Sequence, residues 1–217
     1  MLANDKQLQA LVDLFRRGTK LTYKKGELII RPGEKPTAVF FIETGLVKAY
    51  DITKYGEENL LIIRRPQEIF PLIRLITGEG PTVIYEALST VTVWRLDQQT
   101  YLDNLTKRPE LIPPLLDMVI EMYKIHSERI INLEYRTVRE RLVSFLLTMA
   151  KRFGETQKDG TILIDVPLRQ QDIASSINAS RETAGRELSR LEQKDLISTK
   201  HSRITLNDIE KLWSYFK

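Results

Sequence analysis

Cysteine is absent from all 217 residues of this chain. Its absence excludes disulfide bonds, thiol redox sensing, cysteine-ligated iron–sulfur clusters and thiolate zinc sites. Histidine is scarce as well, because His126 and His201 are the only two and they lie far apart in the sequence. Carboxylates could contribute to a metal site, but a histidine-based one is not expected. We therefore predict no metal cofactor and no enzyme of the metal-dependent cupin type, and we assign no catalytic residue.

Long apolar runs are also missing. No run approaches the ~18 to 20 apolar residues that cross a bilayer. The first seven residues, Met-Leu-Ala-Asn-Asp-Lys-Gln, lack the basic and then apolar pattern of a secretion signal. We therefore expect a cytoplasmic protein with no membrane partner.

The charge of the chain is only modestly positive, at +4. Residues 1–137 hold 19 Lys and Arg against 18 Asp and Glu, whereas residues 138–217 hold 14 against 11. The excess therefore lies mainly in the smaller C-terminal part. Such a weak excess supports nucleic-acid binding only beside a recognisable motif.

The N-terminal half is dominated by short β-type runs. From Leu21 to Leu96 these runs are separated by turn residues such as Gly45 and Gly56, which predicts a small β-barrel or sandwich. Helical spacing predicts short helices over residues 5–16 and 98–106, one on each side of it.

A long helix is predicted from Pro113 to about Tyr135, and it carries two apolar stripes. One stripe is Leu111, Leu115, Met118, Met122 and Ile125; the other is Ile112, Leu116, Val119, Tyr123, His126, Ile130 and Leu133. A helix with one neighbour needs one stripe, so the second stripe favours a homodimer. The alternative is a helix buried between two parts of the same chain.

The C-terminal part has the pattern of a winged helix-turn-helix. A helix over residues 137–152 is followed by a polar loop at 154–160 and a strand at 162–166. Two short helices then follow within residues 171–191, with a tight turn at Asn178, and residues 196–206 form a hairpin. Asn207 is predicted to cap a last helix.

The second helix of that motif carries side chains that can read DNA. Arg181 and Arg186 can donate to guanine O6 and N7, and Glu182 can accept from cytosine N4. The residues expected to hold phosphates are Arg169, Gln170, Ser180, Thr183, Lys200, His201 and Arg203. The alternative is an exposed helix that carries Glu–Arg pairs, and the neighbouring strand and wing argue against it.

Two motifs carry a resemblance to a known family: Ser180-Arg-Glu-Thr-Ala-Gly-Arg186 and Arg31-Pro-Gly-Glu. Over nearly its whole length the chain resembles the cyclic-AMP receptor protein and fumarate–nitrate regulator family of bacterial transcription factors. The resemblance implies an α+β fold: an antiparallel β-roll effector domain (1–109), a dimerisation helix (110–137) and a winged helix-turn-helix domain (138–217). It further implies a homodimer on a TGTGA and TCACA palindrome, with RNA polymerase as a partner.

The expected effector site departs from the family pattern. Where cyclic-AMP-binding members have a glutamate for the ribose and an arginine for the phosphate, this chain has neither. Cyclic AMP is therefore not expected to bind in the usual mode. The effector-side candidates are Leu72, Arg74, Thr82, Tyr123, His126 and Ser127. Either an unidentified small molecule is the effector, or the regulator acts without one. Further alternatives are a cyclic-nucleotide-responsive regulator and a sensor that binds a protein in place of DNA.

Overall fold

The computed structural model describes residues 2–78 and 83–216. The chain divides into two compact units. The β-roll unit comprises residues 1–56 and 61–123, and the helix-turn-helix unit comprises residues 57–60 and 124–217. Of the predicted effector-side residues, Thr82 lies outside the described residues.

In the described part of the β-roll unit, eight strands form two four-stranded sheets, ordered β1-β8-β3-β6 and β2-β7-β4-β5. Antiparallel pairing joins β1 to β8, β8 to β3, β3 to β6, β2 to β7 and β7 to β4. The strands are β1 (Thr19–Tyr23), β2 (Leu28–Ile30), β3 (Ala38–Thr44), β4 (Val47–Ile52), β5 (Glu58–Arg64), β6 (Ile69–Phe70), β7 (Ile84–Ala87) and β8 (Val91–Asp97). The predicted β-roll is confirmed.

The glycine between β3 and β4 is required by its surroundings. Gly45 has a φ of +85°, and a Cβ built on it would lie 2.3 Å from the Thr90 carbonyl oxygen. A larger residue would therefore need both a disfavoured backbone conformation and a shift of the neighbouring strand.

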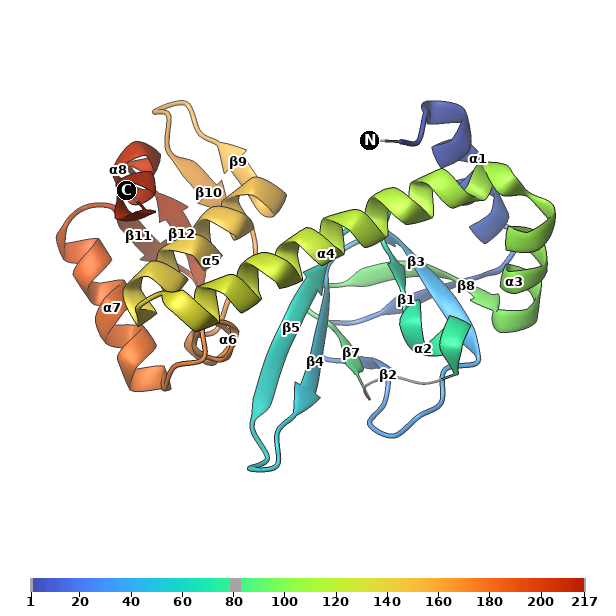
Figure 1. Ribbon diagram of the computed structural model, residues 1–217, viewed down its shortest axis with the longest axis horizontal. Helices are drawn as coiled ribbons and strands as arrows, with labels where there is room; N and C mark the ends of the chain where they lie inside the picture. Colours follow the sequence, from blue (N-terminus) through green and yellow to red (C-terminus); the bar gives the residue numbers. More distant parts are fainter. Residues whose placement is uncertain (1, 79–82, 217) are drawn as a thin grey trace. The chain divides into compact units, whose positions relative to one another are not determined.

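Helices close one end of the β-roll unit. These are α1 (Asp5–Phe15), α3 (Gln98–Lys107) and the 3₁₀ turn η1 (Pro109–Leu111), which leads into α4 (Ile112–Tyr135). Phe15 stacks on Phe41 with ring centroids 5.4 Å apart, and both belong to a buried cluster that includes Leu111 and Leu115. Figure 1 shows α1 and α3 beside the first turns of α4. A short helix, α2 (Ile73–Thr77), was not predicted.

Among the described residues, the helix-turn-helix unit contains four further α-helices and a four-stranded sheet, ordered β11-β12-β10-β9. Helix α5 contacts both helices of the motif and two strands of the sheet (Figure 1). The elements are α5 (Val138–Phe153), β9 (Gly154–Thr156), β10 (Ile162–Ile164), α6 (Gln170–Ser176), α7 (Arg181–Gln193), β11 (Ile197–Lys200), β12 (Arg203–Leu206), α8 (Ile209–Trp213) and η2 (Ser214–Phe216).

Two local predictions in this unit were wrong. The segment predicted as a polar loop begins with strand β9, in which Glu155 pairs with Leu163 of β10; a polar sequence gave no strand signal because β9 is fully exposed. The last helix is capped by Asp208 in place of Asn207, since the Asp208 side chain accepts from the Lys211 backbone N–H. Asn207 instead donates to Asp195.

Candidate nucleic-acid interface

A sharp turn joins α6 to α7, and Asn178 makes it. Asn178 has a φ of 49°, in the left-handed region that asparagine tolerates better than most residues. The backbone N–H of Ala179 donates to the Ala174 carbonyl at 3.0 Å, and Ala174 is fully buried. The small side chain and the left-handed residue together let the two helices pack closely.

Helix α7 begins with a serine cap and presents its first turns to solvent. The Ser180 hydroxyl accepts from the Thr183 backbone N–H at 3.2 Å, which satisfies one of the unpaired N–H groups of the helix start. Arg181, Glu182 and Arg186 are all exposed. The Thr183 hydroxyl accepts from Arg186 Nη2 at 3.2 Å, so this arginine is held near the helix start.

The carboxylate of Glu182 is suited to accept a hydrogen bond. Its own backbone N–H and the Ser180 hydroxyl lower the pKa of Glu182, and the charges of Arg181 and Arg186 add to that effect. The group is therefore ionised at neutral pH, as an acceptor for a cytosine amine must be.

The inward face of α7 contains a charged residue that the sequence did not reveal. Ala184, Leu188 and Leu191 are buried as predicted, but Glu187 is buried beside them. Its Oε2 accepts from Arg139 Nε of α5 at 2.7 Å. Burial opposes ionisation of Glu187, but Arg139 and then Arg190 outweigh it, so its pKa is lowered. A glutamate within an otherwise apolar face of α7, with an arginine at the start of α5, is the signal that could have indicated the pair.

Several of the predicted phosphate-holding residues are exposed. Gln170 is exposed at the start of α6. Lys200 and His201 are exposed in the wing, which is the hairpin of β11 and β12, and His201 has a φ of 51° in its turn. Arg203 is partly buried and pairs with Asp165. The wing therefore offers charge on both sides of its turn.

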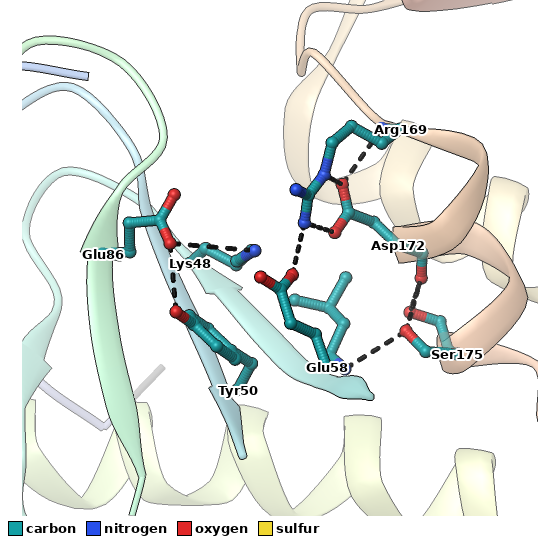
Figure 2. A network of polar contacts seen from close by, with 9 residues as sticks. Lys48, Tyr50, Glu58, Glu86, Arg169, Asp172 and Ser175 are labelled. Carbon is teal, nitrogen blue, oxygen red and sulfur yellow. Dashed lines mark hydrogen bonds and ion pairs between the residues drawn. The ribbon is translucent and has the colours of Figure 1, made fainter. Parts of the chain in front are cut away.

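Arg169 is engaged by two carboxylates. Its Nε and Nη2 donate to the buried Asp172 at 3.0 and 2.8 Å, and its Nη2 also donates to Glu58 at the start of β5 (Figure 2). Asp172 and then Glu58 raise the pKa of Arg169, although burial opposes them. The guanidinium is charged, and in this structure it is hydrogen-bonded to the carboxylates of Asp172 and Glu58.

The predicted effector-side residues fall in both units. Leu72 is buried and precedes α2, and Arg74 is half-buried within it. On α4, Tyr123 is 72% exposed, whereas His126 and Ser127 are partly buried. Tyr123 belongs to the β-roll unit, while His126 and Ser127 belong to the helix-turn-helix unit.

The β-roll contains a buried lysine that the sequence did not predict. Lys48 on β4 is 2% exposed. Its Nζ lies 4.0 Å from a carboxylate oxygen of Glu86 and 4.2 Å from the ring centroid of Tyr50. The Tyr50 hydroxyl donates to the same carboxylate at 3.1 Å (Figure 2). A lysine between apolar residues of one short strand was the available signal.

Arg64 on β5 is a second buried cation, at 3% exposure. Its Nη1 lies 3.5 Å from Glu68 and 2.8 Å from the Met122 sulfur, while its Nε is buried without a hydrogen-bond partner. Burial raises the pKa of the Tyr85 hydroxyl, and Arg64 partly offsets that rise. The interior of the β-roll thus contains two buried cations, each within 4.0 Å of a carboxylate oxygen.

The two stripes of α4 differ in exposure. From the first stripe, Leu111 and Leu115 are buried and Met118 packs against the same cluster, as predicted for contact with the β-roll. Most of the second stripe is exposed, including 47% of Val119. Its exposed members are Ile112, Leu116, Val119, Tyr123, Ile130 and Leu133.

In residues 2–78 and 83–216, no group of three or more His, Asp or Glu side chains is placed to hold a metal ion. Across the same ranges, none of the helices combines the length and apolar character needed to cross a membrane.

Both units match known domain families. The profile of the cyclic nucleotide-binding domain matches residues 20–108. The profile of the Crp-like helix-turn-helix domain matches residues 140–215.

Curated relatives match over almost the whole chain. The "Global nitrogen regulator" of Synechococcus elongatus is 31% identical over 215 residues, which cover 95% of each protein. The "CRP-like cAMP-activated global transcriptional regulator" of Mycobacterium tuberculosis is 25% identical, and the match covers 94% of this chain and 90% of that protein. These relatives are transcription regulators, not enzymes.

Solved structures match the fold. A CooA mutant from Carboxydothermus hydrogenoformans has a TM-score of 0.80 at 19% identity, with 100% of this chain and 98% of that one covered. FixK2 from Bradyrhizobium japonicum has a TM-score of 0.77 at 22% identity, with 91% and 96% covered.

Proposed function

Because this chain belongs to the cyclic-AMP receptor protein and fumarate–nitrate regulator family of transcription regulators, we propose that it is a sequence-specific homodimer. It binds a palindrome of TGTGA and TCACA half-sites in the cytoplasm and acts on RNA polymerase. Residues 1–109 serve as the effector domain, 110–137 as the dimerisation helix and 138–217 as the DNA-binding domain.

The observation that carries the proposal is the exposed start of the capped helix α7. Arg181 and Arg186 contact guanines in the major groove, and the ionised Glu182 accepts from a cytosine. Gln170, Ser180, Thr183, Lys200, His201 and Arg203, together with Arg169, hold the phosphates that set the register.

The partner for the second stripe of α4 is a second copy of the chain. With the partly buried His126 included, the stripe keeps the alternating spacing of four and three that packs two helices side by side. A two-fold dimer places its recognition helices about 34 Å apart, one turn of DNA, which matches a palindromic site.

The β-roll is the regulatory part, and a small-molecule effector acts through it. Cyclic AMP is not that effector in the usual mode, since the stretch Ile69-Phe-Pro-Leu-Ile-Arg74 lacks the glutamate with which cyclic-AMP-binding members hold the ribose. Lys48 and Arg64 are buried cations suited to an acidic molecule. Tyr123, His126 and Ser127 on α4, with Arg74, are the residues we propose on the other side of the effector.

Fluorescence anisotropy with a labelled TGTGA and TCACA duplex tests the proposal. Binding should be tighter than to a scrambled duplex by a factor of about 10³ or more at physiological salt, and it should weaken steeply as salt rises. Equal affinity for both duplexes would exclude sequence-specific recognition. Titration of cyclic AMP by calorimetry should give no heat of binding, and measurable binding would refute its exclusion.

A further inference from the structure

The start of strand β5 is attached to the first helix of the helix-turn-helix. Residues 57–60 belong to the same compact unit as residues 124–217. Glu58 accepts a hydrogen bond from Arg169 just before α6, and the Leu60 backbone N–H donates to Ser175 Oγ of α6 at 3.2 Å. Figure 2 shows Glu58 facing Arg169 and Asp172.

Arg129 of α4 joins the same contact. Its Nη1 donates to the Leu60 carbonyl at 2.9 Å. Its Nη2 lies 3.2 Å from both Asn59 Oδ1 and the Ser175 carbonyl. One guanidinium therefore bridges β5 and α6, and the attachment of residues 57–60 rests on side-chain and backbone bonds together.

The attachment engages a residue that DNA binding needs. Under the proposed function, Arg169 donates to a DNA phosphate. Glu58 is hydrogen-bonded to Arg169, so a phosphate bound by Arg169 would lie close to the Glu58 carboxylate. The two negative charges would repel each other. Asp172 is buried three residues away on the same helix start and keeps its pair with Arg169. Glu58 is the partner that DNA can replace.

We propose that Glu58 is an acidic latch that holds Arg169 in the DNA-free protein and is displaced by a DNA phosphate. This inference rests on the proposed DNA binding. It adds an internal competitor for the DNA-contacting surface, supplied by the first residues of β5. Displacement of the latch also removes one of the bonds that attach residues 57–60 to α6, so DNA binding is coupled to a loosening of the start of β5.

The latch is tested with the full-length chain and the variant Glu58→Gln. The matched control is Glu155→Gln, which removes one negative charge from the exposed strand β9 of the same unit. Glu58→Gln should raise affinity for the palindromic duplex by about two- to fivefold over the control, the range of a partly exposed ion pair. Equal affinities of the two variants would overturn the latch.

A double-variant cycle and hydrogen exchange complete the test. In an Arg169→Gln background, Glu58→Gln should give no gain over the control, and a persistent gain would show that Glu58 acts elsewhere. In the wild-type chain, DNA should speed amide exchange in a peptide covering 57–60, and unchanged exchange would contradict the loosening of this segment. Specific binding by wild type without these effects refutes the latch alone. Absence of specific binding in every variant refutes the proposed function and the latch with it.

Discussion

Arg139 Nε donates a hydrogen bond to Glu187 Oε2 at 2.7 Å, and this bond ties α5 to the recognition helix α7. Glu187 also pairs with Arg190 one turn further along α7. The carboxylate is mostly buried while both arginines reach solvent. The pair therefore fixes the inner face of the helix whose outer face is proposed to enter the groove.

Replacing Glu187 by glutamine should loosen that attachment. The variant leaves Arg139 without its anionic partner, and we expect the free energy of unfolding to fall by about 1 kcal/mol. Urea denaturation of wild type and variant measures the difference. Glu192→Gln, on the exposed side of the same helix, is the control and should leave stability unchanged within about 0.5 kcal/mol. Equal losses in both variants would contradict a specific role for Glu187.

The Glu187 contribution should depend on pH with a definite sign. The pKa of Glu187 in the folded chain is lowered from its ordinary value of 4.5, because the two arginines outweigh burial. The folded chain thus binds the proton less readily than the unfolded chain, and stability from this group is fully present above about pH 4.5. The stability gap between wild type and Glu187→Gln should shrink as pH falls below that value. Denaturation from pH 7 to pH 3 measures it, and a gap that widens toward low pH would be inconsistent with the lowered pKa.

Substitution in the second stripe of α4 should weaken the dimer. Val119→Gln places a polar side chain in the proposed seam twice per dimer, and we expect the dimer dissociation constant to rise about tenfold or more. Sedimentation equilibrium gives that constant. Ile76→Gln is the control, since Ile76 is a similarly exposed apolar residue on α2 outside the stripe. A monomeric wild type, or equal effects of both substitutions, would argue against α4 as the dimer interface.

Removal of a base-reading arginine should change specificity as well as affinity. Arg186→Ala should cost about 1–3 kcal/mol at the palindromic site and relax the preference at one base pair of each half-site. Arg181→Ala should do the same at a different base pair. Anisotropy with duplexes that vary one position at a time measures both quantities. Equal weakening on random DNA would mean that these arginines bind phosphates only.

The features that the sequence predicted correctly are those with local causes. Ser180 caps a helix and Asn178 makes the preceding turn through interactions within a few residues, so the helix-turn-helix was recognisable from the chain alone. The two apolar stripes of α4 could also be identified from the sequence, because helical spacing involves only residues three and four positions apart. The resemblance to a known family supplied the β-roll and the order of the parts.

The features that escaped prediction depend on residues distant in sequence. Glu58 and Arg169 are 111 residues apart, and no local pattern marks them as partners. Lys48 lies in a short strand, and the sequence of that strand does not indicate how deeply Lys48 is buried. Its position beside Glu86, which lies on another strand, is set by the fold. Strand β9 forms because β10 pairs with it, despite a polar sequence that alone favours a loop.

Selection of bound sequences from a random DNA pool tests the central claim most directly. The purified chain should enrich palindromes with TGTGA in one arm and TCACA in the other, their centres about one helical turn apart. Repeating the selection with Arg181→Ala and Arg186→Ala should lose the enrichment at the base pairs each arginine reads. Recovery of no common sequence, or of sites that survive both substitutions unchanged, would contradict recognition of DNA by the start of α7.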